Sequence, residues 1–330
     1  MPIVGFFKDL DEVHKLTQPM LLSGVVEEII KVGGIMPKLP IEVVRGKSLK
    51  YNREKSLPAG GFYDVHEAIP WTSTVEFTVP MEVELKRIIF NAMLDRFVHT
   101  YENINDYEAI MVSLIAKGLA QTLEQTLVYG TDATQGLGTK AFSGLWQLCD
   151  SAMRIENHGT GGPLSLSKLR LLLDTVKFRP DMLLMPFSVA SRIDAAYQEA
   201  GISSFVGPGR ISWANNEAGQ RVTFFDSIPI LRSDFMKMTE GDSSPYDGAQ
   251  ANGSIFAIHF GRIAEGGVSL LLSEQGAGAG AAGFFKVVKL DELEDYDASG
   301  IRFVLYVALA VGSTKALGHL CNITDAAVIA

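Results

Sequence analysis

The spacing of apolar residues predicts one long amphipathic helix in the first half of the chain. Between residues 107 and 129 the apolar positions recur at α-helical spacing, which predicts a helix about 35 Å long. Asn105 and Asp106 before this segment have side chains that cap helices, and Gly130 after it is a common stop. The apolar positions are Met111, Leu114, Ile115, Leu119, Leu123 and Leu127.

Later segments alternate between helical and strand patterns, which predicts an α+β fold. Residues 164–178 and 186–199 have helical spacing, and Ser165 or Ser167 is expected to cap the first of them. Residues 221–233 are expected to form two strands hinged at Pro229. Further strands are expected at residues 182–185, 254–260, 268–272, 284–290 and 301–311.

The first 46 residues resemble an extended arm more than a folded unit. Short apolar patches are interrupted by Pro19, Pro37 and Pro40, and only residues 21–32 suggest a short helix. Fully stretched, such a segment reaches on the order of 150 Å. An arm of this kind buries little on its own domain, so we expect it to lie on neighbouring molecules.

Residues 47–79 predict a β-hairpin that projects beyond the body of the protein. Strands are expected at residues 48–55 and 72–79, and Gly60 and Gly61 lie between them. Each limb could extend about 50 Å, whereas a globule of this size has a radius of gyration of about 20 Å. A two-stranded hairpin is marginal alone, so we expect it to complete its packing on another copy. A hairpin folded back onto its own core is the alternative.

Opposite charges gather at the hairpin and near the end of the chain. Such patches suit head-to-tail contact between copies, although two solvated faces would give the same pattern. We expect Trp71 to anchor the same contact. The basic residues at the hairpin are Arg45, Lys47, Lys50, Arg53 and Lys55. The acidic complement is Asp291, Glu292, Glu294, Asp295 and Asp297.

The amino-acid composition argues against several classes of protein function. The 330 residues are 47% hydrophobic and 20% charged, which suits about two domains with cores of their own. The net charge of −9 argues against tight binding of nucleic acid. The longest apolar run, residues 303–311, is shorter than the ~20 residues that span a bilayer as a helix. No signal peptide pattern is present, so we expect a soluble protein without a membrane partner.

Motifs that suggest chemistry are better explained by structure. Cys149 and Cys321 lack the CxxC spacing and the histidines are scattered, so we expect neither disulfides nor a metal site. A GxGxxG match at residues 278–283 precedes a β-like segment instead of a helix, which argues for a flexible loop. An SxxK match at residues 165–168 lacks its partner motifs. We therefore predict no cofactor and no enzymatic activity.

The order of segments resembles that of the major capsid proteins of tailed bacteriophages, which share the Hong Kong 97-type fold. An arm, a projecting basic hairpin, a long helix, a mixed α/β body and a late apolar strand follow one another. The likeness covers most of the chain. It is carried by residues 83–130, FSGL at 142–145, VTFFDSIPILRSDF at 222–235, IFAIHFG at 255–261 and residues 301–324.

The resemblance implies a division of the chain into named parts. These would be an N-terminal arm (1–46), an extended loop (47–79), a peripheral domain (80–149) with a spine helix (106–129), an axial domain (150–298) and a return to the peripheral domain (299–330). Joints that adapt the subunit to different rings, and that act as hinges during shell expansion, are expected at glycines. These are Gly60, Gly61, Gly130, Gly276, Gly278 and Gly280.

The resemblance also implies a structural role. Copies would assemble into pentamers and hexamers of an icosahedral head, folded in the bacterial cytoplasm, that encloses double-stranded DNA. The DNA would face the inner surface without sequence-specific binding. Other partners would be a portal, a possible decoration protein and a separate scaffolding protein, since few residues precede the loop. An encapsulin-like nanocompartment shell is the alternative, and a cytosolic α/β enzyme is a more distant one.

Overall fold

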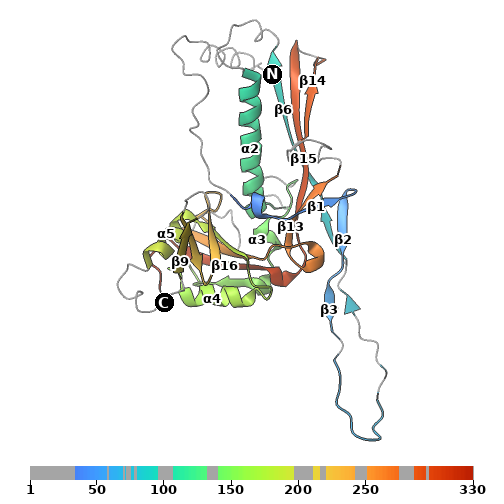
Figure 1. Cartoon of the computed structure of the whole chain (residues 1–330), viewed down its shortest axis with the longest axis vertical. Helices are drawn as coiled ribbons and strands as arrows, with labels where there is room; N and C mark the ends of the chain where they lie inside the picture. Colours follow the sequence, from blue (N-terminus) through green and yellow to red (C-terminus); the bar gives the residue numbers. More distant parts are fainter. Residues whose placement is uncertain are drawn as a thin grey trace.

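Two β-sheets and one long helix form the body of the protein, and a hairpin projects from it (Figure 1). This is a computed structural model, and the α+β architecture agrees with the fold class predicted from the sequence. The described residues are 34–57, 59–69, 71, 76–77, 80–95, 107–131, 140–196, 211–215, 221–241, 251–274, 286–294 and 297–329.

The first sheet has five strands and is organised around β15 (Ala298–Val311). This strand pairs antiparallel with β6 (Lys86–Asp95), β14 (Lys286–Leu290) and β13 (Val268–Ser273). Strand β1 (Ile41–Val44) adds to the sheet by pairing parallel with β13. Strands β15 and β13 consist of nearly continuous apolar runs and are buried along nearly their whole length. Such runs are expected in strands that are covered on both faces.

Helix α2 (Tyr107–Tyr129) packs against this sheet and confirms the helix predicted from apolar spacing. Leu119 on the helix meets Ile301 and Phe303 of β15 in one buried cluster. Near the C-terminal end of α2 the packing tightens, and Leu123 and Leu127 are fully buried. The expected capping residues, Asn105 and Asp106, lie outside the described residues.

The second sheet has seven strands and carries two helices. Residues of β8 alternate between its two sides, as strand geometry requires. Leu183 and Met185 pack with helices α4 (Leu166–Thr175) and α5 (Phe187–Ala196), and Met182 and Leu184 join the other core. In order, the strands are β7 (Arg154–Glu156), β16 (Leu317–Thr324), β12 (Asn252–Ile258), β8 (Met182–Pro186), β11 (Ile228–Ser233), β10 (Arg221–Phe225) and β9 (Ile211–Asn215).

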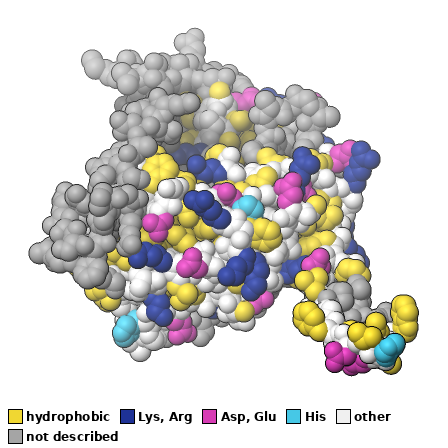
Figure 2. Space-filling view, turned by 60° about the horizontal axis from the view of Figure 1, so that its bottom comes forward, with side chains coloured by type: hydrophobic (Ala, Val, Ile, Leu, Met, Phe, Trp, Pro, Cys, Tyr) yellow, Lys and Arg dark blue, Asp and Glu magenta, His cyan; other side chains and the backbone are white. Residues whose placement is uncertain are grey.

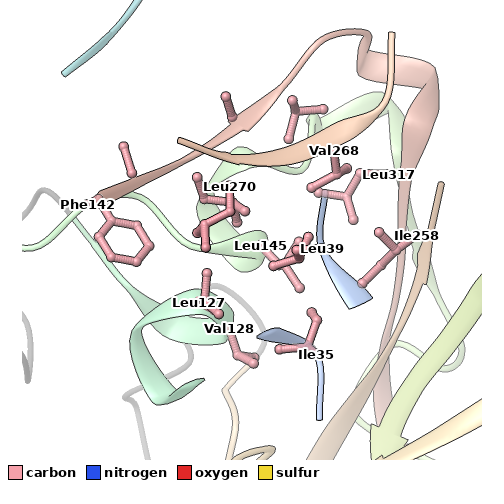
Figure 3. Close-up of a cluster of buried hydrophobic side chains, with 14 of the residues drawn as sticks. Ile35, Leu39, Leu127, Val128, Phe142, Leu145, Ile258, Val268, Leu270 and Leu317 are labelled. Atoms are coloured by element: carbon pink, nitrogen blue, oxygen red, sulfur yellow. The ribbon is translucent and has the colours of Figure 1, made fainter. Parts of the chain in front are cut away.

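One hydrophobic core joins the two sheets (Figure 3). Leu127 of α2 and Leu270 of β13 come from the first sheet's side, and Ile258 of β12 and Leu317 of β16 come from the second sheet. Short helices fill the space between: η1 (Met36–Lys38), α3 (Leu145–Leu148), η3 (Ser151–Met153), η4 (Ile263–Glu265) and η5 (Thr314–Ala316). The shared core makes the two sheets one packed body.

Gly130 is required by close packing at the end of α2. Its N–H donates to the Thr126 carbonyl oxygen, and its own carbonyl oxygen accepts from the N–H of Gly144, each at 2.7 Å. A Cβ atom at position 130 would collide with the carbonyl oxygens of Phe142 and Thr126. Glycine is therefore needed at position 130 because neighbouring backbone atoms leave no room for a side chain. Its expected role as a hinge stays a prediction.

The turn between β10 and β11 differs from the hinge expected at Pro229. The chain reverses at Asp226 and Ser227, which have φ angles of 47° and 66°. Two residues with positive φ form the tight turn whose twist matches paired strands. Pro229 instead lies within β11, opposite Phe224. The expectation was wrong because proline was taken as the turn signal in place of the Asp-Ser pair.

The sheets divide the chain differently from the boundaries that the resemblance implied. Strands β13 and β14 were expected in the axial segment (150–298), yet they join the sheet of β6 and β15. Strand β16 was expected in the return segment (299–330) to the peripheral domain, yet it pairs with β12 and β7. Pairing over long separations cannot be read from segment order, which explains both differences, and the domain boundaries themselves stay a prediction. Residues 1–33 of the expected arm lie outside the described residues.

Truncating the buried end of α2 will destabilise the subunit. Leu127→Ala is expected to lower the free energy of unfolding by about 2–5 kcal/mol, because it removes buried methyl groups and leaves a cavity. Leu114→Ala, on the same helix but half exposed, is expected to change it by less than about 0.5 kcal/mol. Chemical denaturation of the unassembled chain measures both, and equal losses would contradict the packing described here.

Candidate assembly surface

A two-part hairpin forms the projecting loop, which we define as residues 47–84. At its base β2 (Ser48–Tyr51) pairs with β5 (Met81–Glu84), and further out β3 (Glu54–Ser56) pairs with β4 (Glu76–Phe77). Pairing therefore continues past residue 79, where the loop was expected to end. The loop extends away from the body at the lower end of the molecule (Figure 1), so the alternative of a hairpin folded back onto its core is wrong.

Large apolar side chains on this loop are exposed to solvent. Phe62 and Trp71 have relative exposures of 106% and 102%, which means that nothing within the described residues covers them. In the space-filling view hydrophobic side chains gather on the projecting loop, apart from the body (Figure 2). The others are Leu57, Tyr63, Val65, Ile69, Phe77 and Met81.

The loop cannot lower its free energy by packing on its own chain. Fully burying one large apolar side chain is worth roughly 1.5–3 kcal/mol, and Phe62 and Trp71 gain almost none of it in the single chain. A projecting surface with this composition is typical of a protein–protein contact. Gly60 and Gly61, expected to be hinges, lie on this exposed stretch, and a hinge role for them stays a prediction.

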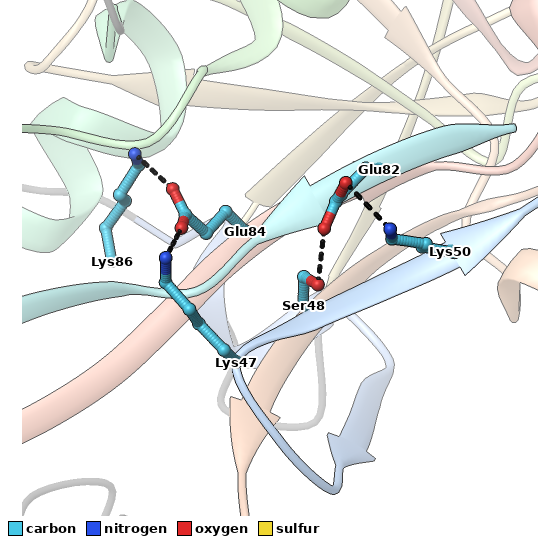
Figure 4. A network of polar contacts seen from close by, with 6 residues as sticks. All are labelled: Lys47, Ser48, Lys50, Glu82, Glu84 and Lys86. Atoms are coloured by element: carbon cyan, nitrogen blue, oxygen red, sulfur yellow. Dashed lines mark hydrogen bonds and ion pairs between the residues drawn. The ribbon is translucent and has the colours of Figure 1, made fainter.

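Ion pairs across the two limbs hold the base of the loop together (Figure 4). Glu84 pairs with Lys47 and with Lys86, the second at 2.9 Å, and these hydrogen bonds lower the pKa of Glu84 to about 2. Ser48 donates to Glu82 at 2.7 Å, and Lys50 pairs with it at 3.2 Å. These contacts lower the pKa of Glu82. Apart from Lys86, these charged groups are exposed or half-exposed, so each pair contributes little by itself.

The basic residues expected to face a neighbour are paired within their own chain. Besides the two lysines at the base, Lys55 pairs with Glu76 at 2.8 Å and Arg45 with Glu274 at 2.9 Å. Counting charges over residues 45–55 alone missed these acids, because most of them lie on the returning limb. Alternation of Glu76, Glu82 and Glu84 along that limb is the sequence signal that could have revealed them. A contact between copies through the basic residues stays a prediction.

Arg53 fixes the loop to the end of β15. Its Nη2 donates to the Val311 carbonyl oxygen at 2.6 Å, and its Nε donates to that of Gly312 at 2.7 Å. The Tyr51 hydroxyl also donates to the Val311 carbonyl oxygen, at 2.7 Å. Two neighbouring loop residues thus bind adjacent carbonyl groups of the body, which sets the direction in which the loop leaves it.

The acidic residues lie on the turn between β14 and β15. Asp291, Glu292, Glu294 and Asp297 are exposed there, and Asp295 lies outside the described residues. This turn and the projecting loop lie toward opposite ends of the molecule (Figure 1), so one chain does not bring the two charged groups together. Gly276, Gly278 and Gly280, the remaining expected hinges, also lie outside the described residues.

A cavity of about 350 Å³ opens at the base of the loop. No sequence pattern indicated this cavity, since its walls come from four separate segments. The residues that line the cavity are Gly46, Lys47, Leu85, Arg87, Ser273 and Tyr306.

Within the described ranges, no group of three His, Cys, Asp or Glu residues is placed to hold a metal ion. No described helix is both long and apolar enough to cross a membrane.

Solved structures of an encapsulin, of a capsid and of a phage have a fold similar to that of this chain. An encapsulin of Synechococcus elongatus PCC 7942, the holo-SrpI complex, has a TM-score of 0.67 at 16% identity, covering 88% of this chain and 87% of that chain. The capsid of an empty GTA particle, computed with C5 symmetry, has a TM-score of 0.65 at 12% identity, covering 94% and 96%. A chain of Microbacterium phage Oxtober96 has a TM-score of 0.61 at 14% identity, covering 95% and 98%.

The comparisons confirm the Hong Kong 97-like capsid fold predicted from segment order, over nearly the whole chain. At these identities the likeness shows the fold alone. No family model matches the sequence, and no curated protein matches it. The role of the chain within this fold class therefore has to be argued from its own surface.

Removing the Arg53 contacts will loosen the base of the loop. Arg53→Ala is expected to lower hydrogen-exchange protection of residues 48–56 by roughly tenfold or more, because hydrogen bonds from a charged donor are worth about 1.5–3 kcal/mol. Lys55→Ala removes one exposed ion pair of the same loop and is expected to change protection much less. If both variants behave alike, Arg53 does not fix the loop.

Proposed function

We propose that this protein is a shell-forming structural subunit, the major capsid protein of a tailed bacteriophage head. The observation that carries the proposal is the projecting loop, which exposes Phe62 and Trp71 fully while Arg53 hydrogen-bonds its base to the body. A rigid projection with an apolar surface is an arrangement that is completed by a second molecule.

The second molecule is best supplied by another copy of the chain. A loop that leaves one end of the body can lie on the adjacent copy in a ring, and each copy then gives and receives one such contact. Each contact can be modest, since a closed lattice repeats it many times. The shell-forming structures with this fold, one of them treated with five-fold symmetry, support rings of this kind.

In this proposal the rings are pentamers and hexamers of an icosahedral head that encloses double-stranded DNA and is assembled in the host cytoplasm. The net charge of −9 favours a wall that faces DNA without binding it tightly. A portal, a separate scaffolding protein and a possible decoration protein complete the set of partners. The acidic turn after β14 is proposed to meet basic residues of another copy, in competition with the ion pairs within each loop. The proposal assigns no catalytic role to the chain.

An encapsulin-like compartment shell is the second candidate, favoured by the TM-score of 0.67 to an encapsulin. Both candidates use the same contacts between copies, so the contents of the particle distinguish them. Particles purified from the native source are expected to contain genome-length double-stranded DNA. Nuclease-resistant DNA measured by gel electrophoresis tests this. A packaged protein without DNA, identified by mass spectrometry, would favour the compartment.

Polar substitution on the loop will prevent assembly without unfolding the subunit. The double variant Phe62→Ser, Trp71→Ser is expected to remain folded, because both side chains are fully exposed in the free chain. It is expected to stay unassembled at concentrations where the wild type forms shells, since each copy loses apolar burial of several kcal/mol. Sedimentation velocity and negative-stain images measure assembly, and thermal unfolding checks the fold.

Leu171→Ser is the matched control for this test, because Leu171 is a half-exposed apolar residue outside the loop. It is expected to assemble like the wild type. Shells that form with the double variant at the same threshold concentration would rule out the loop as the assembly surface. A wild-type chain that remains a monomer or dimer, even with its scaffolding protein present, would rule out the shell function itself.

A further inference from the structure

A buried carboxylate lies where the end of α2 meets the seven-stranded sheet. Glu240, on the segment that follows β11, is only 1% exposed. The Tyr129 hydroxyl at the end of α2 donates to its Oε1, and the Ser254 hydroxyl of β12 donates to its Oε2. The Glu240 N–H donates to the carbonyl oxygen of Asn252 at 2.9 Å, so both backbone and side chain of this residue are held.

The hydrogen-bonded chain continues on both sides of the carboxylate. The N–H of Lys237 donates to the Tyr129 hydroxyl oxygen at 2.8 Å. On the other side His319 Nε2 lies 2.8 Å from Ser254 Oγ. The His319 ring stacks on Phe256 at 4.6 Å and meets the edge of Trp146 at 4.5 Å. Helix α2 is thereby tied to β12 and β16 through one carboxyl group.

The groups that face Glu240 leave its charge poorly compensated. Burial raises its pKa to about 7, against the lowering effect of its two hydrogen bonds and of Lys237 and Arg154. These two cations lie over aromatic rings, Lys237 Nζ at 5.5 Å from the Tyr129 centroid and Arg154 at 5.1 Å from that of Trp146. Burial lowers the pKa of His319, which is therefore neutral. Burial also raises the pKa of the Cys321 thiol to about 11, so it too is uncharged at neutral pH.

We propose that Glu240 is a proton-dependent latch between α2 and the seven-stranded sheet, closed when the carboxyl group is protonated and weakened when it ionises. A neutral carboxyl group donates its proton to one of the two hydroxyls, and His319 adopts the tautomer that completes the chain. An ionised carboxylate must stay buried with no ion-pair partner among the described residues, or the junction must open to admit water. The latch belongs to the folded subunit and does not depend on the proposed function.

The sign of the pH effect follows from the direction of the shift. A carboxyl group whose pKa is higher in the closed junction than in water binds its proton more tightly when the junction is closed. Its stabilising effect is complete below the ordinary carboxyl pKa of 4.5 and is lost as the pH rises from there through about 7. In an assembled shell, the same change would make it easier for α2 to move relative to the seven-stranded sheet above neutral pH.

Hydrogen exchange of the full-length chain tests the latch at its own location. After correction for intrinsic exchange rates, protection of residues 122–131 and 317–324 is expected to fall about tenfold between about pH 6 and about pH 8. This is the change that results when one carboxyl group has a pKa of about 7 in the closed junction and of 4.5 in the open one. Glu240→Gln keeps the shape of the side chain but cannot ionise, so its protection is expected to be independent of pH. Glu156→Gln, an exposed carboxyl on β7, is the control and should behave like the wild type.

Ser254→Ala separates a latch from a merely structural role. It removes one hydrogen bond that favours the ionised carboxylate, so the midpoint of the pH dependence is expected to move to higher pH. This shift is measurable even if the variant is less stable at every pH, or if Glu240→Gln fails to fold. A midpoint that stays in place in Ser254→Ala, or a pH dependence retained in Glu240→Gln, would overturn the proposal.

Discussion

Main-chain pairing along β15 is the interaction on which the rest of the structure depends. This strand of 14 residues pairs with β6, β14 and β13 and carries the apolar residues against which α2 packs. Its last carbonyl, on Val311, and that of Gly312 also receive the hydrogen bonds of Tyr51 and Arg53. The strand therefore supports the sheet, positions the long helix and sets the direction of the projecting loop.

The loop itself combines a rigid base with an outer part that has no core of its own. Ion pairs around Glu82 and Glu84 and the contacts of Arg53 satisfy polar groups near the body. Further out, nothing within the described part of the chain covers the Phe62 and Trp71 side chains. The exposed apolar surface of such a loop points in one direction relative to the body. Ordered assembly requires this, because apolar surface without a defined direction would lead to aggregation.

Local patterns predicted what local interactions determine. Apolar spacing predicted helix α2 with the bounds that the structure has. The strands expected at residues 48–55 and 72–79 overlap β2, β3 and β4, whereas β5 at residues 81–84 was not part of the predicted hairpin. Pairing partners far apart in sequence could not be predicted, which is why β13, β14 and β16 belong to sheets other than those expected. The same limit hid the partners of Lys47 and Lys50, as well as the junction of Tyr129, Glu240 and His319, whose members come from three distant segments.

The central claim is that the exposed loop of one copy is buried on the next. A cryo-EM reconstruction of purified particles at side-chain resolution tests it most directly. The account predicts that each loop crosses onto the adjacent subunit and that Phe62 and Trp71 lose their exposure there. Loops folded back on their own subunit, or loops whose Phe62 and Trp71 remain in solvent within an intact shell, would contradict it.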